Sequence, residues 1–163
     1  MLGVDCGSIR TGVAVIENDG RGYRVLHYGA IQPVRSRGFG ERLRHIHQEL
    51  EKLVEEFRPH TIALEEVFQA FNVKSAMQLS QVRGIVLLLA ARAGLPVSEY
   101  SALTVKNSVV GYGRAEKHQV QRMVQRMLSL AAPPEPEDAA DALAVALCHL
   151  HTETTRQRLA GKS

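Results

Sequence analysis

Four acidic residues of this chain stand where ordinary packing would not place a carboxylate. Asp5 ends a short apolar run, and Glu65 lies inside the apolar stretch 62–68. Asp138 and Asp141 are three residues apart in an alanine-rich segment, so a helix would present them on one face. Because isolated buried carboxylates are costly unless they are paired or bind metal, the four acids are candidate ligands of a metal centre.

The chemistry open to such a group of acids is that of a hydrolytic metal site. Carboxylate oxygens around a cleft suit Mg²⁺ or Mn²⁺. Two such ions about 4 Å apart can activate water and stabilise the leaving oxygen when a phosphodiester is cleaved. That reaction needs three or four acids from different elements, and the chain offers this number.

Each acid also has an ordinary structural explanation. Asp5 can cap the turn that follows it, Glu65 or Glu66 can be a solvated strand end, and Asp138 can cap a helix. We favour the metal site because three unrelated structural roles, on two strands and one helix, would otherwise have to place carboxylates at these positions by chance.

The elements that must position these acids follow from the hydrophobic pattern. Residues 2–5, 11–16 and 23–31 are typical of three consecutive antiparallel strands. Apolar residues at helical spacing over 41–57 predict a surface helix, and 61–67 predicts a fourth strand.

The second half of the chain alternates helices with one more strand. Residues 72–93 predict a long helix, 96–100 a fifth strand, and 120–128 a further helix; the last helix follows Pro133 and Pro134. The order β-β-β-α-β-α-β-α-α indicates an α/β fold with a mixed sheet and helices on both faces. Because residues 85–91 are apolar all round, the long helix is either a central core helix or a dimer interface.

Composition and charge limit the classes of protein. With 45% hydrophobic and 23% charged residues, the 163 residues fit one globular domain, expected over 1–151, with a polar, flexible tail over 152–163. A net charge of +3 permits an anionic partner without requiring one. The two distant cysteines indicate neither a zinc site nor a disulfide framework. The N-terminus is unlike a signal peptide and residues 84–91 are too few to span a bilayer, so we expect a cytoplasmic protein without a membrane partner.

Several short motifs are spread over roughly residues 2–150. Their order and spacing together are specific for one protein family, although any one motif alone would be weak evidence. They are Gly3-Val4-Asp5-Cys6-Gly7-Ser8 with Thr11-Gly12, Ala63-Leu64-Glu65-Glu66-Val67-Phe68, Asn72, Ser75-Ala76, Gln81, Arg83-Gly84, Val105-Lys106, Val109-Val110-Gly111, Ala115-Glu116-Lys117, Gln119-Val120 and Asp138-Ala139-Ala140-Asp141-Ala142-Leu143-Ala144. Together they resemble the RuvC family of crossover junction endodeoxyribonucleases, in the ribonuclease H-like superfamily.

The resemblance implies roles for the acids and for several other residues. The fold would be ribonuclease H-like, with three antiparallel strands and two parallel additions in a five-stranded sheet. Asp5, Glu65, Asp138 and Asp141 would be catalytic and hold two Mg²⁺ or Mn²⁺ ions, with Glu65 rather than Glu66 as the invariant acid. Further residues would contact DNA or support the transition state: Lys106 and Lys117 near the scissile phosphate, Phe68 inserted at the junction unless it is a core residue, and Phe71, Asn72, Lys74, Arg83, Arg10 and Arg114. Cys6 stands where the family usually has proline, which bears on local stiffness and on sensitivity to oxidation.

The resemblance also implies an activity and partners. A homodimer would cut a four-way DNA junction by paired symmetric nicks that leave a 5′-phosphate and a 3′-hydroxyl, in recombination and repair. It would work with a branch-migration motor complex of the RuvA/RuvB type. Three alternatives stay open: a YqgF-type nuclease of the same superfamily, an actin-like nucleotide-binding protein, and a junction-binding protein without catalysis. The Asp-Ala-Ala-Asp helix disfavours the first and the chain length the second, while the presence of all four acids disfavours the third.

Overall fold

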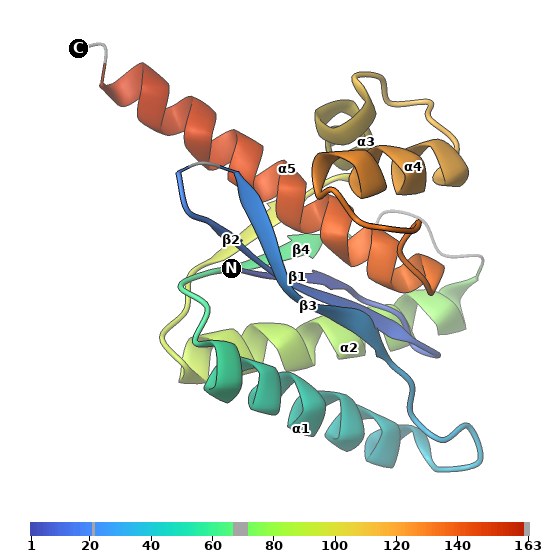
Figure 1. The fold of residues 1–163 in the computed structure, drawn as a ribbon. Coiled ribbons are helices and arrows are strands. Elements are labelled where there is room, and N and C mark those ends of the chain that lie inside the picture. Colours follow the sequence, from blue (N-terminus) through green and yellow to red (C-terminus); the bar gives the residue numbers. More distant parts are fainter. Residues whose placement is uncertain (21, 67–71, 162–163) are drawn as a thin grey trace.

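A five-stranded mixed sheet forms the centre of the computed structural model, which describes residues 1–20, 22–66 and 72–161 (Figure 1). The strands are β1 (Leu2–Asp5), β2 (Thr11–Asn18), β3 (Tyr23–Ile31), β4 (Ile62–Glu65) and β5 (Val97–Tyr100), in the spatial order β3-β2-β1-β4-β5. β1 to β3 are antiparallel to one another, whereas β4 and β5 add parallel to β1. This is the sheet that the sequence predicted.

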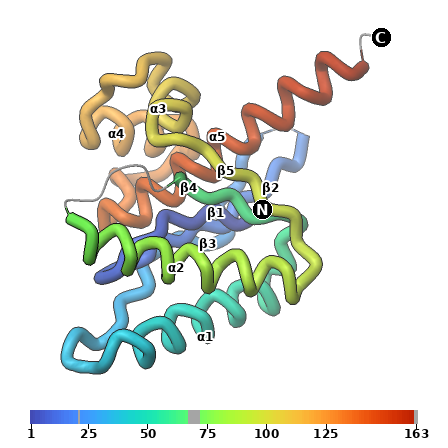
Figure 2. Tube along the Cα trace, turned by 180° about the vertical axis from the view of Figure 1, so that it is seen from behind, coloured from blue at the N-terminus to red at the C-terminus, as the bar shows by residue number. Residues whose placement is uncertain are grey.

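Helices cover both faces of the sheet, as Figures 1 and 2 show. α1 (Phe39–Phe57) and α2 (Val73–Arg92) lie on one face, over a core that includes Leu2, Val4 and Leu64. α5 (Glu137–Ala160) crosses the other face, and the short helices α3 (Ala102–Val110) and α4 (Lys117–Met127) pack beside it. No helix in the described ranges is both long and apolar enough to cross a membrane.

α5 lies unusually close to the sheet because small residues meet on both sides. Gly3 of β1 faces the backbone of Ala142, and Gly12 of β2 faces the backbone of Asp138; a Cβ atom on Gly12 would be 1.8 Å from that carbonyl oxygen. Residues 142–148 of α5 are all almost completely buried. The alanine-rich sequence of this helix therefore sets how near the first turn of α5 can come to β1 and β2.

Two elements differ from those predicted. The sequence analysis missed α3, so the observed order has three helices after β5 rather than two; Ser101 caps this nine-residue helix and Gly111 ends it. The last helix was also expected to stop near residue 151, but α5 continues to Ala160. Its last turns are exposed, and i,i+4 hydrogen bonds from threonine hydroxyls to backbone carbonyls, such as that from Thr155 to His151, accompany the extension. Whether these turns are flexible stays a prediction.

We expect Gly12→Ala to destabilise the protein by about 1–3 kcal/mol, because the added methyl group pushes the start of α5 off the sheet. Gly40→Ala is the matched control: it lies in α1, and an added Cβ there meets no atom within 4 Å. Urea unfolding followed by circular dichroism gives both values. Equal midpoints for the two variants would contradict the close contact.

Candidate active site

Two of the four acids stand at the ends of adjacent parallel strands. Asp5 ends β1 and Glu65 ends β4, and the register pairs Val4 with Leu64 just before them. Val4 and Leu64 pack toward α1 and α2. Because side chains alternate along a strand, Asp5 and Glu65 project to the opposite face, where α5 lies.

The start of α5 supplies the other two acids. Asp141 lines a pocket of about 290 Å³ together with Asp5 and Glu65. The remaining lining residues are Ala102, Val105, Lys106, Lys117, Val120 and Ala144. Asp138 lies outside this lining, near Asp5, and its carboxylate is 3.9 Å from the guanidinium of Arg10. The structure thus brings three of the four predicted acids together with both predicted lysines, and Asp138, the fourth acid, lies beside this pocket.

Burial and mutual repulsion shift the acids toward their neutral forms. The pKa of Asp5 is raised to about 7, mostly by burial and in addition by the neighbouring carboxylates of Asp141, Glu65 and Asp138. Burial also raises the pKa of Glu65 and of Asp141, the former with help from Asp141 and the latter against the opposing pull of Lys117. Such a site favours any cation that can enter it.

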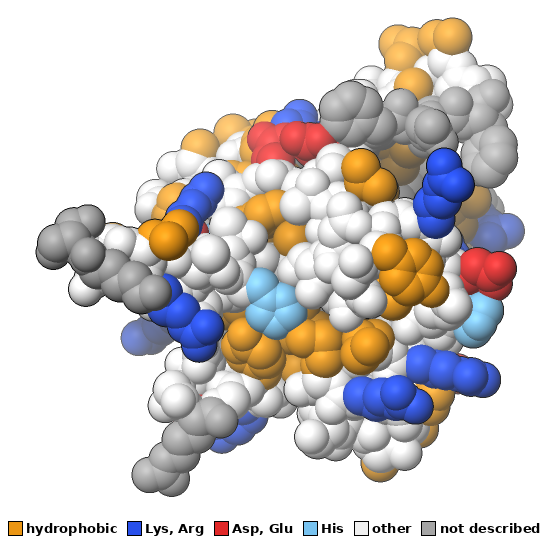
Figure 3. Space-filling view, turned by 90° about the horizontal axis from the view of Figure 1, so that it is seen from above, with side chains coloured by type: hydrophobic (Ala, Val, Ile, Leu, Met, Phe, Trp, Pro, Cys, Tyr) orange, Lys and Arg blue, Asp and Glu red, His pale blue; other side chains and the backbone are white. Residues whose placement is uncertain are grey.

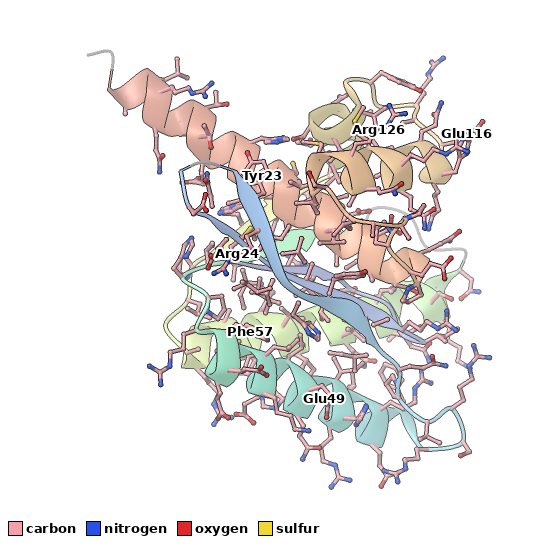
Figure 4. The ribbon with its side chains drawn as sticks, viewed as in Figure 1. Tyr23, Arg24, Glu49, Phe57, Glu116 and Arg126 are labelled. Carbon is pink, nitrogen blue, oxygen red and sulfur yellow. The ribbon has the colours of Figure 1, made fainter. Side chains whose placement is uncertain are left out.

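Lys117 is the cation nearest to these acids. Its ammonium donates a hydrogen bond to Asp141 at 3.2 Å and lies 3.8 Å from Glu137. Burial lowers the pKa of Lys117, but the carboxylates of Asp141, Glu137 and Asp5 together outweigh this and leave the pKa raised. The backbone at this position is fixed because Glu116 and Gln119 form a reciprocal capping box at the start of α4. Figure 4 labels Glu116 at this helix end.

Lys106 reaches the pocket from α3, the helix that the sequence analysis missed. Val105 and Val109 anchor α3 in the core, and Lys106 lies next to Val105 at the pocket wall. The signals were present in the sequence: an N-cap serine, two valines four residues apart and a glycine at the C-terminus. Glu137, whose carboxylate lies 3.8 Å from the ammonium of Lys117, is a charged residue near the site that the sequence analysis did not single out.

The donor set fits a hard divalent cation by its chemistry. In the described part of the chain, no three His, Cys, Asp or Glu side chains form a group that holds a metal ion as they stand. Asp5, Glu65 and Asp141 nevertheless share one pocket, and neighbouring carboxylates help to raise their pKa values, so a cation among them removes an electrostatic cost. Carboxylate oxygens are ligands that Mg²⁺ and Mn²⁺ prefer.

The other residues predicted to contact DNA lie in varied positions. Phe68 and Phe71 fall outside the described residues. Asn72 caps α2, its side chain accepting a hydrogen bond from the backbone N–H of Ser75 at 2.9 Å. Lys74 and Arg114 are exposed. Arg83 forms a salt bridge with Glu99 and so joins α2 to β5.

Cys6, beside Asp5, is buried, and burial raises the pKa of its thiol to about 12, which leaves it unreactive at neutral pH.

Comparison with known proteins gives the same family from sequence and from structure. Residues 1–149 match the sequence model of the crossover junction endodeoxyribonuclease RuvC. The protein of that name from Ruminiclostridium cellulolyticum is 49% identical over 149 residues, which are 91% of this chain and 90% of that protein. The one from Koribacter versatilis is 45% identical and spans 100% of this chain and 99% of its own length. The chain belongs to the RuvC family.

Solved structures support the assignment to the RuvC family. The structure of Thermus thermophilus RuvC in complex with a Holliday junction substrate matches with a TM-score of 0.86 and 34% identity, over 91% of each chain. A yeast mitochondrial Holliday junction resolvase shares the fold alone, with a TM-score of 0.64 and 15% identity, over 90% of this chain and 75% of its own. The predicted family resemblance and five-stranded fold are confirmed.

The raised pKa of Asp5 predicts how stability depends on pH when no metal is bound. The unfolded chain loses this proton near pH 3.8, whereas the folded protein keeps it up to about pH 7, so stability falls as pH rises through this window. We expect Asp5→Asn, in EDTA, to raise the free energy of unfolding by roughly 2–4 kcal/mol at pH 8 and by little at pH 4.

Urea unfolding at the two pH values measures this difference. Glu55→Gln, which removes an exposed carboxylate on α1, is the control and should change stability little at either pH. A gain for Asp5→Asn that is equal at pH 4 and pH 8 would show that its charge is not the cause.

Proposed function

We propose that the chain cuts four-way DNA junctions by paired, symmetric, metal-dependent nicks, as a nuclease of recombination and repair. The observation that carries this is the pocket in which Asp5, Glu65 and Asp141 meet Lys106 and Lys117, in a chain of the RuvC family. A family member with 34% identity has been solved with a Holliday junction substrate. The products are a 5′-phosphate and a 3′-hydroxyl.

Divalent metal ions are part of this activity, since the RuvC family is metal-dependent. We assign Asp5, Glu65, Asp138 and Asp141 to hold two ions, either Mg²⁺ or Mn²⁺. The ions would activate water and stabilise the leaving oxygen. The raised pKa values of Asp5, Glu65 and Asp141 mean that metal binding displaces protons, so activity should rise with pH.

The two lysines act on the phosphate rather than on the metal. Lys106 and Lys117 line the same pocket as the acids, from α3 and α4. An ammonium group at this place can hold a DNA phosphate and neutralise the charge that develops as the bond breaks. Phe68, Phe71, Asn72, Lys74, Arg10 and Arg114 remain proposed DNA contacts. Arg83, which forms a salt bridge with Glu99, also remains a proposed DNA contact.

We infer that α2 forms the interface of a homodimer. Val82, Val86 and Leu89 of α2 are buried in the core, but Leu88 on its other side is 52% exposed. Met77 and Val73, nearer the start of α2, are 60% and 77% exposed. A two-fold dimer can place two identical sites on a junction that itself has approximate two-fold symmetry. We also propose that the dimer works with a branch-migration motor complex of the RuvA/RuvB type, in the cytoplasm.

Glu65→Gln tests the activity and the site together. Wild type and variant are each incubated with a synthetic four-way junction and with a matched linear duplex, in Mg²⁺, Mn²⁺ or EDTA, and products are resolved on a denaturing gel. We expect symmetric nicks in the junction alone with metal, and a loss of at least about 10²-fold in Glu65→Gln, because one carboxylate ligand is lost. Glu66→Gln, the adjacent residue, is the control and should retain most of the activity.

Two results would redirect the proposal. Binding of the junction without cutting in either metal would make the chain a non-catalytic junction-binding protein. Equal cutting of the linear duplex would keep the metal site and remove the preference for junctions.

Leu88→Glu tests the interface on α2. A charge buried in a dimer contact costs several kcal/mol, so we expect this variant to sediment as a monomer at concentrations where the wild type is a dimer. Leu103→Glu on α3, which is 59% exposed, is the matched control and should leave the dimer intact. Identical sedimentation of both variants would exclude α2 as the interface.

A further inference from the structure

Arginines gather on the connection between β3 and α1 and on the first turns of α1. Residues 32–48 contain Arg35, Arg37, Arg42 and Arg44 but only one acidic residue, Glu41. None of the four lines the acidic pocket. We refer to Arg35, Arg37 and Arg42 as the arginine patch.

The charges of the arginine patch are not neutralised within the described residues. Arg44 has Glu41 as a neighbour at 4.0 Å, whereas Arg35, Arg37 and Arg42 have no carboxylate within that distance in ranges 1–20, 22–66 and 72–161. The guanidinium of Arg42 lies over the ring of Phe39, 5.3 Å from its centroid, which holds the side chain in place and leaves its charge available. Arg35 and Arg37 are exposed. Three uncompensated cations in eight residues favour an anionic partner.

A hollow lies beside two arginines of the patch. It has a volume of about 170 Å³ and is lined by Arg37, Arg42 and His45, with Pro33, Val34 and Glu41. α1 begins beside it, and no side chain caps this helix end. The free N–H groups of the first turn therefore add to the positive potential that the two arginines create.

Strand register places the patch at the same end of the sheet as the acidic pocket. Asp5 pairs with Gly12, and Gly12 pairs with Ala30, so Ala30 is two strands, or about 10 Å, from Asp5. The five residues from Ala30 to Arg35 span at most about 17 Å. Figure 1 shows the β3–α1 connection on the side where α2 and α5 begin. Arg35, the first arginine of the patch, therefore lies within about 27 Å of Asp5, which is less than one turn of a DNA duplex.

We propose that the arginine patch binds the phosphate backbone of one junction arm, within about eight nucleotides of the phosphate that is cut, at a rise of 3.4 Å per nucleotide. This inference rests on the proposed function, and it adds a second contact that positions the arm. The face of the molecule toward α3–α5 is a poorer candidate, because its Lys and Arg side chains lie apart from one another near the edge of the view, with mostly hydrophobic and other uncharged groups between them (Figure 3).

A variant with Arg35→Gln, Arg37→Gln and Arg42→Gln tests the contact. Junction affinity is measured in EDTA, where nothing is cut, from 50 to 200 mM salt. Each lost phosphate contact reduces the slope of log K against log salt by about 0.9, so we expect a slope lower by roughly 2–3 and an affinity at least about 10-fold weaker at low salt. Replacing the same residues with lysine should retain the slope, which separates charge from folding.

A matched control removes three other exposed arginines, Arg122, Arg126 and Arg158. They lie on α4 and at the end of α5, on the opposite face from α1, as Figure 4 shows for Arg126. The control should bind with nearly the wild-type slope. An equal decrease in both triple variants would mean that net charge, not the patch, governs binding, and would overturn the assignment.

Neutral methylphosphonate linkages locate the contact on the DNA. Placed in turn at linkages within about eight nucleotides of the cut phosphate, those at the contact should weaken binding by the wild type but not further weaken binding by the glutamine variant. If the wild type binds and cuts junctions while the glutamine variant keeps its affinity and slope, only the patch assignment fails, and an acidic protein becomes the partner to test. If the wild type neither binds nor cuts, the proposed function fails as well.

Discussion

The close contact between α5 and the sheet is the constraint on which the site depends. Glycines at positions 3 and 12 let the backbone of α5 rest directly on β1 and β2. Asp138 and Asp141 are rigidly attached to that backbone, so the same contact that fills the core also sets their distance from Asp5. Packing and the candidate site therefore share one interface, and a methyl group added there acts on both. α5 is rich in alanine because only small side chains allow so close an approach to the sheet.

The cost of this arrangement is electrostatic. Asp5, Glu65 and Asp141 are brought together before any cation is bound, and burial and repulsion raise their pKa values. Lys117 offsets part of the repulsion through Asp141. The folded, metal-free protein thus carries unfavourable energy that a divalent ion relieves, which is a physical basis for metal affinity without a closed cage of ligands. The capping box at Glu116 keeps Lys117 within reach of the acids while its side chain can still turn toward a phosphate.

The sequence was informative where local pattern and global fold agree. The three antiparallel strands, the acids at two strand ends and the Asp-Ala-Ala-Asp helix all had a signal of period two or of helical spacing. α3 was missed because its nine residues carry only two buried valines, too few for a clear period. The length of α5 was underestimated because its last turns bury little and are polar. Contacts such as Arg83 with Glu99 depend on the register between α2 and β5, which no local pattern encodes.

The acidic pocket and the arginine patch carry opposite charges, which suits one to metal binding and the other to DNA binding. The pocket must be acidic to attract metal, and for that reason it repels the phosphate backbone that it has to cut. Two lysines in the pocket neutralise only part of this repulsion, so attraction of DNA has to come from elsewhere on the same end of the sheet. Arg35, Arg37 and Arg42 have the required sign and are free of carboxylate partners among the described residues. They lie on the connection after β3 and at the start of α1, at the same end of the sheet as Asp5. Separation of the two charges lets the metal site stay acidic while the arm of the DNA is held, because at physiological salt charges more than about 8 Å apart are largely screened from one another.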